Sequence, residues 1–596
     1  MRRVILGAGL LAIAAITRPA GADVTVSIDA SKAHQTWFGF GATTLPLIYD
    51  TKDDVPADLR ALAIAAIYRD VQVTTGNLEI APYESPATAL YSPANDDSDP
   101  ATLSASGFNF RQSDNMKSAF VDPGAPFGFV DWYLHASIAT GFELAWANAL
   151  RTSNRALFLD ECAEHVFAGA KHWRDAYGKT PELIMPFNEP ESGNREFQST
   201  DPKLLVDTIA AVGARLRKEG FATMKMVAPN EETTALSLSN AKAILDDPAA
   251  GPMLGAIGYH TYPYGSQYAS IPNILAASGA GKPNAAEITI RNQLRDLAKA
   301  HGTMLFMSEV SHGEVDPRSY DSFRGRAIHI HDEMVYADVN GFFGMNAMWD
   351  TVTHADHFAG RDPGFWSGEM EGDVIKIDVA GKAVIISGMG RAIGHYARFI
   401  HRGDVRIDAT SDDALVQVTA FRRGSYAALD AINNASAPRT LQIALNGVSP
   451  TGSVTGEQST DDAGGTYWKA LAPTALGAGG KFSATLPALA VATFAIGDAP
   501  ISGTDAGPDA TSDGGGDAAS SDTGDGGASG PDGGGVDASA VDTGAPGEAP
   551  AASDSGCGCR TAGGSELRGM GGLAAWGALV AIGLGRRRRR SLFSAR

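Results

Sequence analysis

Two glutamates, Glu189 and Glu309, stand where short apolar runs stop, in the stretches MPFNEPESG (185–193) and FMSEVSHG (306–313). A carboxyl group can donate or accept a proton or attack an electrophilic carbon. Paired carboxyl groups do both in the hydrolysis of glycosidic bonds, where one is the proton donor and the other the nucleophile. Retention of configuration requires the two groups about 5 to 5.5 Å apart, so the fold must bring these distant positions together.

Either glutamate alone has an ordinary interpretation, because a Glu after a strand is most often solvated or salt-bridged. Their common position at the ends of two strands, with Asn188 directly before the first, favours a catalytic pair. Other carboxylates compete for a role as substrate contacts or surface charges: Glu191, Glu231, Glu232 and Glu314.

The elements that must position these residues are short apolar runs alternating with amphipathic helices between about residues 38 and 400. The runs lack polar alternation, as expected for strands buried on both faces of a parallel sheet. They are 38–43, 71–80, 142–150, 183–190, 223–232, 256–263, 303–311 and 341–351. Helical stripes occur in DLRALAIAAIYRDV, ALFLDECAEHVFAGAKHWRDAYG, DPKLLVDTIAAVGARLRKEG and AEITIRNQLRDLAKAHG. The pattern predicts an α/β fold, a (β/α)₈ TIM barrel over residues 38–400.

In such a barrel the residues at the C-terminal ends of the strands line the active site, which adds further candidates. Asn188 is expected to bind the 2-hydroxyl of a sugar, an interaction that strengthens in the transition state. His260 and Tyr262, in YHTY at the sixth strand end, are expected to hold the nucleophile by hydrogen bonds. Trp146 and Trp349, at the third and eighth strand ends, are expected to offer flat apolar faces to sugar rings.

A second domain follows at residues 401–500, where short strands such as ALVQVTAF and RTLQIALNG are separated by Asn, Gly, Ser and Asp. This predicts an antiparallel β-sandwich domain. The leading segment 23–37, with VTVSIDA, alternates in the same way, so both ends of the body are expected to form this domain.

Metal and cofactor chemistry find little support in the sequence. The pairs His329/His331 and His354/His357 have no third convergent ligand, and residues at i and i+2 of a helix do not share one face. They are interpreted as surface or packing residues. Cys162 falls at helical spacing with apolar neighbours and is predicted to be a core residue. No metal and no cofactor are expected.

The two ends of the chain indicate export. Residues 1–22 combine two arginines, an apolar stretch and a final Ala-Gly-Ala, which is typical of a cleaved signal peptide; a short buried helix is the alternative. Residues 501–556 are rich in Asp, Gly, Ser and Ala and are predicted to be a disordered spacer. With a net charge of −20, nucleic acid is not an expected partner.

The last segment, 557–596, joins Cys557-Gly-Cys559 to an apolar run (569–585) and five arginines. The run is about 25 Å long as a helix, slightly short for a bilayer. This order of parts resembles the Myxo-type C-terminal sorting signal, which implies presentation at the cell surface and membrane contact through the helix. A simple tail anchor is the alternative.

From residue 24 to 497 the sequence resembles glycoside hydrolase family 30, within the clan A retaining β-glycosidases. The matching stretches are HQTWFGFGAT (34–43), HVFAGAKHWRDAYG to IMPFNEPESG, FMSE, GHYARFIHRGDVRIDAT (394–410) and LPALAVATFAIG. The resemblance implies that Glu189 is the acid/base and Glu309 the nucleophile, with the β domain packed against the barrel. One departure is the second strand, where the clan usually has an arginine and this chain has Asn77 and Glu79.

Two functions are therefore considered. The first is an exported retaining glycoside hydrolase acting on a polysaccharide of xylan, β-glucan or galactan type. The second is a non-catalytic carbohydrate-binding or adhesion protein on the same barrel, suggested by the missing arginine and the display tail. The sequence leaves open the sugar, the linkage, endo or exo action and the oligomeric state.

Overall fold

The computed structural model describes most of the body of the 596-residue chain. The described residues are 23–44, 55–80, 99–103, 108, 110–130, 133–135, 145–190, 201–262, 267–311, 315–350, 372–462 and 465–497. The expected signal peptide, acidic spacer and C-terminal sorting segment lie outside them. Within the described helices, none combines the length and apolar character needed to cross a membrane.

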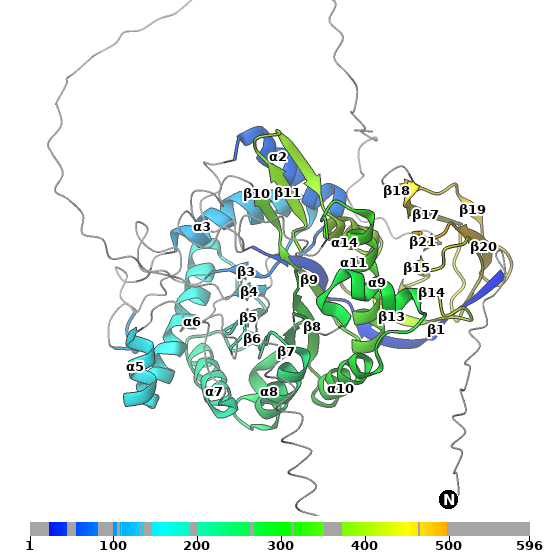
Figure 1. Cartoon of the computed structure of the whole chain (residues 1–596). Helices are drawn as coiled ribbons and strands as arrows, with labels where there is room; N and C mark the ends of the chain where they lie inside the picture. Colours follow the sequence, from blue (N-terminus) through cyan, green and yellow to red (C-terminus); the bar gives the residue numbers. More distant parts are fainter. Residues whose placement is uncertain are drawn as a thin grey trace, which may run out of the picture.

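The body is built on an eight-stranded parallel sheet (Figure 1). In chain order its strands are β2 (Gly39–Thr43), β3 (Leu78–Glu79), β4 (Tyr133–His135), β5 (Leu183–Met185), β6 (Lys225–Val227), β7 (Leu254–His260), β8 (Met304–Glu309) and β9 (Gly341–Asn346). Each strand from β3 to β9 pairs with the next in parallel, and β9 pairs with β2. A parallel bridge between Thr43 and Asn77 joins the two edges of the sheet, which closes it into a ring.

The interior of this ring is filled with side chains. One buried cluster collects residues from six strands and the segment before β2: Phe38, Tyr133, Leu183, Met185, Val227, Ala256, Phe306 and Phe343. The ring is therefore a packed core, and chemistry is confined to its rims.

Helices with polar caps cover the outside of the sheet (Figure 1). They include α2 (Ala57–Ala65), α6 (Arg155–Tyr177), α7 (Pro202–Lys218), α8 (Thr234–Asp246), α9 (Ile271–Gly279), α10 (Ala285–His301), α11 (Tyr320–Asp332) and α14 (Gly388–Ala397). Side chains of Asn154, Asp201 and Thr233 accept backbone hydrogen bonds at the starts of α6, α7 and α8. Gly178 and Gly302 end α6 and α10 in the left-handed conformation. The four predicted helices are confirmed.

The prediction of the third strand at 142–150 is wrong. Residues Ala145–Ser153 form helix α5, and the third strand of the sheet is β4, ten residues earlier in the chain. A short apolar run does not distinguish a buried strand from a helix, because its periodicity is the same in both. Trp146 consequently lies in a helix and not at a strand end.

A three-stranded sheet follows the eighth strand and was not predicted. It consists of β10 (Met348–Asp350), β11 (Ile375–Asp378) and β12 (Ala383–Ile386). Beneath it Asn346 donates to Asp373 at 2.8 Å, and Lys376 pairs with the same carboxylate at 3.0 Å.

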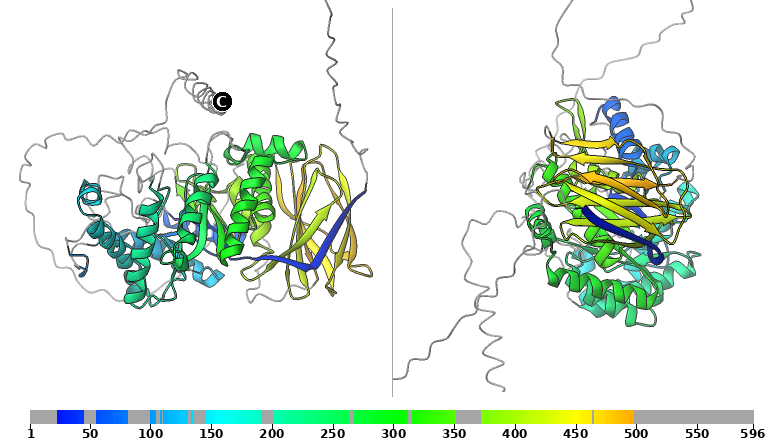
Figure 2. Two further views of the ribbon diagram at one scale, coloured as in Figure 1. Left: turned by 90° about the horizontal axis from the view of Figure 1, so that it is seen from below. Right: turned by 90° about the vertical axis from the view of Figure 1, so that its right-hand side faces the viewer.

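The second domain is a separate sheet that lies to one side of the first (Figure 2). Its strands are β1 (Asp23–Thr36), β13 (Val405–Ser411), β14 (Val416–Arg423), β15 (Tyr426–Asn433), β16 (Arg439–Asn446), β17 (Ser453–Thr460), β18 (Thr466–Ala470), β19 (Thr474–Ala475), β20 (Lys481–Leu486) and β21 (Val491–Ile496). Strand β1, from the start of the body, pairs with β13 and β16.

The expectation of a wholly antiparallel domain needs one correction. Strand β1 is antiparallel to β13 but parallel to β16, so the sheet is mixed. A strand that enters from the far end of the chain is not constrained by a hairpin turn, and it can therefore pair in either direction.

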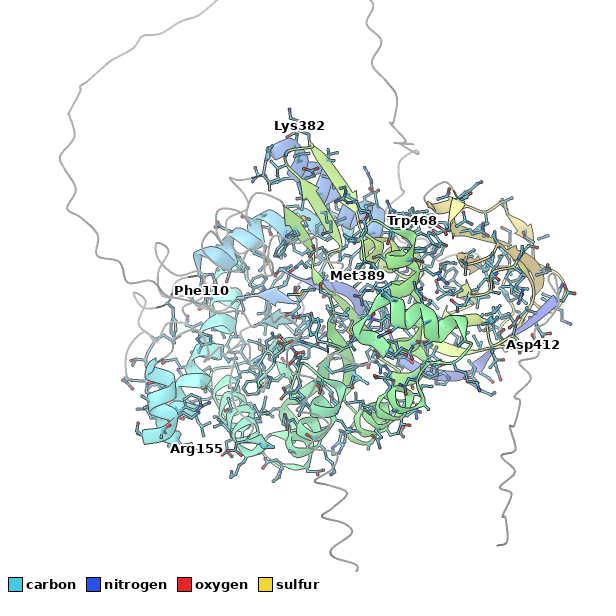
Figure 3. The ribbon with its side chains drawn as sticks, viewed as in Figure 1. Phe110, Arg155, Lys382, Met389, Asp412 and Trp468 are labelled. Atoms are coloured by element: carbon cyan, nitrogen blue, oxygen red, sulfur yellow. The ribbon has the colours of Figure 1, made fainter. Side chains whose placement is uncertain are left out.

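Buried polar contacts hold the two domains together along α11 and α14. The Tyr320 hydroxyl donates toward the carbonyls of Ser459 and Leu489 at 3.1 and 2.9 Å. Trp468 of β18, labelled in Figure 3, donates from its indole nitrogen to the Arg391 carbonyl of α14 at 3.1 Å. The β domain is thus a fixed support for the helices behind the eighth strand.

Asp430 is a buried acid of this second domain whose titration should control stability. It is 1% exposed, its Oδ1 accepts from Thr493 at 2.7 Å, and its Oδ2 has no hydrogen-bond partner within the described structure. Burial raises the pKa of Asp430 well above its ordinary value. Because the folded-state pKa exceeds the unfolded one, ionisation opposes folding at every pH above about 4.

We therefore expect Asp430→Asn to gain stability over the parent as pH rises from 4 to 8. The parent loses up to about 1.4 kcal/mol per pH unit until the folded-state pKa is reached, whereas the amide does not titrate. Urea unfolding of both proteins at each pH measures the difference. Parallel stability curves over this range would contradict a protonated, buried Asp430.

Candidate active site

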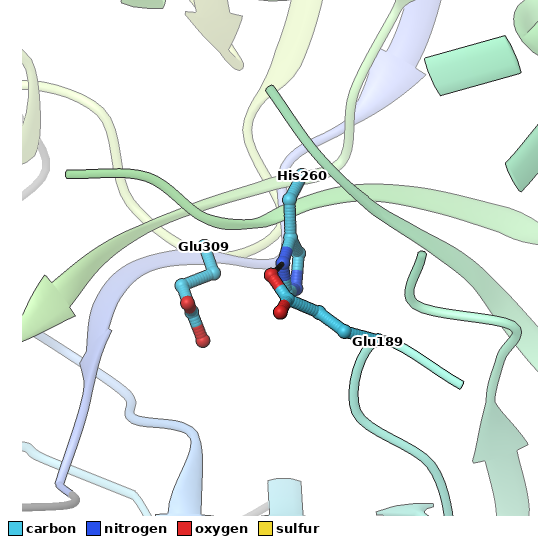
Figure 4. Close-up of side chains that lie close together, drawn as sticks. All are labelled: Glu189, His260 and Glu309. Atoms are coloured by element: carbon cyan, nitrogen blue, oxygen red, sulfur yellow. Dashed lines mark hydrogen bonds and ion pairs between the residues drawn. The ribbon is translucent and has the colours of Figure 1, made fainter. Parts of the chain in front are cut away.

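Glu189 and Glu309 approach each other at the C-terminal rim of the parallel sheet (Figure 4). Glu309 is the last residue of β8, and Glu189 follows β5 by four residues. Both are largely buried, at 8% and 7% exposure. One oxygen of each carboxylate and one ring nitrogen of His260 lie within 4.8 Å of one another. The fold therefore brings together two acids that are far apart in the sequence.

The backbone at Glu189 is strained. Its φ is 43°, in the left-handed region that side-chain-bearing residues seldom adopt, and its amide donates to the carbonyl of Asn230 at 2.9 Å. Asn230 is itself at φ 61°. Such conformations cost about 1 to 3 kcal/mol and concentrate at functional sites, where surrounding structure holds them. The strain here fixes the direction of the Glu189 carboxylate.

His260 contacts Glu189, which corrects the expectation that it would hold Glu309. Its Nδ1 lies 2.9 Å from Glu189 Oε1, and its Nε2 lies 3.0 Å from the Asn230 amide nitrogen. The side-chain oxygen of Asn230 accepts from the Ser308 hydroxyl, so its nitrogen is the donor. Nε2 must then accept, and Nδ1 carries the proton that His260 donates to Glu189.

Tyr262 contacts Glu309 as expected. Its hydroxyl lies 2.8 Å from Glu309 Oε1 and 3.4 Å from the Met345 sulfur. Burial, together with the negative charges of Glu309 and Glu189, raises the pKa of Tyr262 well above its ordinary value. The phenol therefore stays protonated and acts as a hydrogen-bond donor to the carboxylate.

Asn188 lies beside Glu189 and belongs to the same network. The Asn230 amide nitrogen donates to Asn188 Oδ1 at 2.9 Å. This contact holds the amide oxygen of Asn188, so the NH₂ group is the part that can donate to a ligand hydroxyl.

Two residues of this network, Asn230 and Ser308, were not among the sequence candidates. Asn230 connects Asn188, His260 and Ser308, and Ser308 is the residue immediately before Glu309. A signal for Asn230 existed, since it stands in VAPNEE at the end of the fifth strand. The signal for Ser308 was weaker, because a Ser inside an apolar run is common.

The two tryptophan candidates lie in elements other than the parallel strands at whose ends they were expected. Trp146 lies in α5. Trp349 lies in β10, three residues after the eighth strand, where it is 6% exposed and pairs in register with Lys376 of β11. Among the competing acids, Glu191 and Glu314 lie outside the described residues.

The remaining competitors, Glu231 and Glu232, follow β6. Glu231 is fully buried and accepts from Asn240 of α8 at 2.7 Å. Glu232 is partly buried, and burial together with the charge of Glu189 raises its pKa.

Asn77, directly before β3, stands at the closing bridge, where the resemblance drawn from the sequence led us to expect an arginine. Asn77 is 1% exposed, and neither atom of its amide has a hydrogen-bond partner in the described part of the chain. The neighbouring hydroxyl of Thr43 is likewise unpaired there. These groups have the character of a site that takes an ordered water or a ligand hydroxyl.

Glu189, His260 and Glu309 also have the composition of a metal site, but their contacts fit hydrogen bonding. The His260 Nδ1 that would bind an ion is engaged with Glu189, and Nε2 is engaged with Asn230.

His329 and His331 are buried packing residues: His329 bonds to Glu333 at 3.1 Å and His331 to Thr419 at 2.5 Å. Burial lowers their pKa values to about 4 and about 3. The other histidine pair, His354 and His357, lies outside the described residues.

Comparison with known proteins finds solved structures that share the fold. No family model matches the sequence, and no curated protein is a significant relative. Solved structures do match. A GH30 endoxylanase from Clostridium papyrosolvens C71 is 19% identical, with TM-score 0.52 over 80% of this chain and 100% of its own. Xylanase C of the same family from Talaromyces cellulolyticus is 16% identical, with TM-score 0.56 and the same coverage.

A third structure, an endo-β-1,6-glucanase, is 14% identical, with TM-score 0.56 over 80% of this chain and 94% of its own. At these identities the likeness establishes a shared fold.

Proposed function

We propose that this protein is a retaining glycoside hydrolase that cleaves β-glycosidic bonds of a polysaccharide. The observation that carries the proposal is the pair Glu189 and Glu309, with an oxygen of each within 4.8 Å at the C-terminal rim of the parallel sheet. Inverting enzymes hold their carboxyl groups about 6.5 to 9.5 Å apart to admit a water, and this pair is closer. The resemblance to glycoside hydrolase family 30 and the likeness of fold support the same proposal.

In the proposed mechanism Glu309 is the nucleophile. Its carboxylate attacks the anomeric carbon while Glu189 gives its proton to the leaving oxygen, and a glycosyl ester on Glu309 forms. Water then attacks the same carbon as Glu189 takes a proton from it, and the Glu309 carboxylate leaves. The Tyr262 hydroxyl orients Glu309, and His260 orients Glu189.

Asn188 is proposed to donate to the sugar 2-hydroxyl, a contact that gains strength as positive charge develops at the anomeric carbon. Trp146 and Trp349 are proposed to offer flat apolar faces to sugar rings. The proposed substrates are chains of xylan, β-glucan or galactan type. The solved neighbours include both xylanases and a β-1,6-glucanase by name.

We also propose that the protein is exported and displayed at the cell surface. The motivation is the sequence of residues 1–22 and of 557–596, with its Cys-Gly-Cys motif, apolar run and arginines. A protease-accessibility assay on intact cells tests this: digestion of the body without lysis supports display, and protection until lysis argues against it.

A second candidate function is non-catalytic carbohydrate binding on this barrel. Asn77 in the place of the clan's arginine favours it, because one positive charge that would stabilise the nucleophile in its ionised form is absent from β3 and its approach. Binding that survives Glu309→Gln, in a protein that never turns substrate over, would support this alternative.

The first experiment measures reducing-sugar release by the purified protein on xylan, glucuronoxylan, β-1,3-glucan, β-1,6-glucan and galactan. We expect release from one of these classes, with the new reducing end formed first as the β anomer in proton NMR because two displacements retain configuration. An initial α anomer would overturn the retaining mechanism. Silence from folded protein over the whole panel would favour the binding function.

A further inference from the structure

We propose that Thr43, Asn77 and Asn346 are specificity-determining residues that together bind hydroxyl groups of a neutral sugar unit of the substrate. The inference rests on the proposed function and names the chemical class that one part of the rim recognises. It starts from polar atoms that the fold buries in one row and leaves without a hydrogen-bond partner among the described residues.

The three residues lie side by side on neighbouring strands. Thr43, the last residue of β2, is in register with Asn346, the last residue of β9. On its other side Thr43 bridges to Asn77, directly before β3. Paired residues of adjacent parallel strands carry their side chains on the same face of the sheet. The three side chains therefore form one row at the seam where the sheet closes.

This row faces the interior of the closed sheet. A side chain at Gly41 would meet the aromatic side chain of Phe343, a member of the interior cluster, so Gly41 and Thr43, two residues later, both point inward. Leu78 packs in the core shared with the helices, so Asn77 directly before it points the opposite way, which is also inward. At the ends of the strands, inward-pointing side chains line the mouth of the barrel.

The row adjoins the surroundings of Glu309. Met345 directly precedes Asn346, and its amide donates to the carbonyl of Val310 at 3.1 Å. Val310 is the residue after Glu309. The Met345 sulfur also lies 3.4 Å from the Tyr262 hydroxyl that contacts Glu309. Because neighbouring strands are about 4.8 Å apart, a sugar ring held at Glu309 can extend to this row.

Four polar atoms of the row are buried and have no hydrogen-bond partner in the described structure. They are the Thr43 hydroxyl, both polar atoms of the Asn77 amide and Oδ1 of Asn346, in residues that are 5%, 1% and 0% exposed. Asn346 Nδ2 donates to Asp373 at 2.8 Å, so its oxygen is the atom left over. Buried polar groups almost always have a partner, because an unpaired one costs stability. Four in one row therefore indicate a partner that the protein binds.

The row matches hydroxyl groups. The Asn77 amide offers two donors and an acceptor, the Thr43 hydroxyl offers a donor and an acceptor, and Asn346 Oδ1 accepts. A sugar hydroxyl likewise donates one hydrogen and accepts another, so two adjacent hydroxyls can satisfy this set. The row holds no charge, and the Lys376 amine, which shares Asp373 with Asn346, is paired at 3.0 Å. An anionic sugar would be buried here without a counter-charge, so a neutral unit fits.

The test compares the stability of the free protein with its use of substrate in Thr43→Val. Valine keeps the shape of threonine and removes the unpaired hydroxyl, so the thermal midpoint of the free protein should stay the same or rise. By contrast, kcat/KM on the polysaccharide that the parent hydrolyses should fall about three- to tenfold, the loss expected for one neutral hydrogen bond. A hydroxyl that serves only an ordered water would give a lower midpoint and unchanged kinetics, and this result would overturn the proposal.

Two further variants complete the design. Asn77→Leu removes two polar atoms and should lower kcat/KM more than Thr43→Val does. Thr75→Val is the matched control, because the Thr75 hydroxyl is also buried and unpaired among the described residues. Thr75 lies two residues deeper than Asn77, with its methyl group against Gly39 at the start of β2. Its replacement should leave kcat/KM unchanged.

Binding without turnover is measured with trisaccharides as probes. The neutral trisaccharides of the polysaccharide panel, with trigalacturonate as the anionic counterpart, are added to the parent and to Thr43→Val, and the rise of the thermal midpoint is recorded. We expect a neutral trisaccharide to stabilise the parent and to stabilise Thr43→Val less. A stabilisation by trigalacturonate that Thr43→Val abolishes would overturn the neutral class of the ligand.

The outcomes separate the two proposals. If the parent hydrolyses a polysaccharide and Thr43→Val keeps the parental kcat/KM and thermal shift, the role of the row is overturned and the hydrolase stands. If the parent cleaves nothing but a neutral trisaccharide stabilises it more than Thr43→Val, the hydrolase is overturned and the row stands. If Asn77→Leu does not fold, Thr43→Val alone decides. A folded parent that neither cleaves nor binds any member of the panel overturns both proposals.

Discussion

Glu309→Gln is expected to lower kcat/KM by on the order of 10⁴-fold or more on every substrate. The amide keeps the size of the side chain and can still meet the Tyr262 hydroxyl, but it is too weak a nucleophile to form the glycosyl ester. Because no covalent step precedes this attack, good and poor leaving groups should suffer alike. Initial rates on the phenyl and 2,4-dinitrophenyl β-glycosides of the sugar that the parent protein releases from the polysaccharide panel measure the loss of kcat/KM.

The control for this prediction is chemical rescue in Glu309→Gly. Formate in the vacated space can attack the anomeric carbon in place of Glu309, and turnover of the dinitrophenyl glycoside should return with formate concentration. The thermal midpoints of the parent and of Glu309→Gln should be close, which separates lost chemistry from lost structure. A variant that retains a tenth of the parental rate would remove Glu309 from the nucleophile's role.

Glu189→Gln is expected to have a large effect that depends on the leaving group. On the phenyl glycoside the loss should be about 10² to 10⁴-fold, the usual contribution of a general acid/base group. On the dinitrophenyl glycoside the first step should proceed almost normally, because no proton is needed. The second step still needs a base to activate water, so the glycosyl enzyme should accumulate after an initial burst of dinitrophenolate.

Azide provides the decisive measurement for Glu189. It attacks the anomeric carbon of the accumulated glycosyl enzyme without base assistance, and the Glu309 carboxylate leaves as a β-glycosyl azide forms. Added azide should restore steady turnover of the dinitrophenyl glycoside in Glu189→Gln and not in Glu309→Gln. Equal losses on both leaving groups, with no effect of azide, would assign Glu189 a role other than acid/base.

The hydrogen-bond network around Glu189 orders polar residues from four neighbouring strand ends. Asn230 holds Asn188 and His260 in place and takes a hydrogen bond from Ser308, so four residues from β5, β6, β7 and β8 are ordered together. Each strand end contributes one polar group at the rim. This arrangement also explains why His260 meets Glu189 and not Glu309, as its two ring nitrogens are set between Asn230 and the acid.

Several elements could be predicted from the sequence because their signals are local. The stripes and caps of α6, α7 and α10 specify helices, and the unbroken apolar runs of β5, β7 and β8 specify buried parallel strands. The polar residue after each run then identifies a rim position, since the ends of parallel strands share one edge. Glu189, Glu309 and Tyr262 follow from this alone.

Other features depend on contacts that no local pattern encodes. The run at 142–150 has the apolar content of a strand, yet it folds as α5, and the two-residue β3 is too short to carry a periodic signal. The parallel pairing of β1 with β16 joins segments more than 400 positions apart. The hydrogen-bond partner of His260 likewise depends on a long-range contact, because it is set by the register between neighbouring parallel strands.

The sequence by itself determined which residues have the right chemistry and at which strand ends they stand, because hydrophobic periodicity and residue type are properties of short segments. Only the tertiary structure decided which of them meet. The register between parallel strands sets Glu189 against His260 and Tyr262 against Glu309, and it turns Glu231 into the helix layer. A shift of one residue in any of these strands would reverse the side-chain direction and separate the pair.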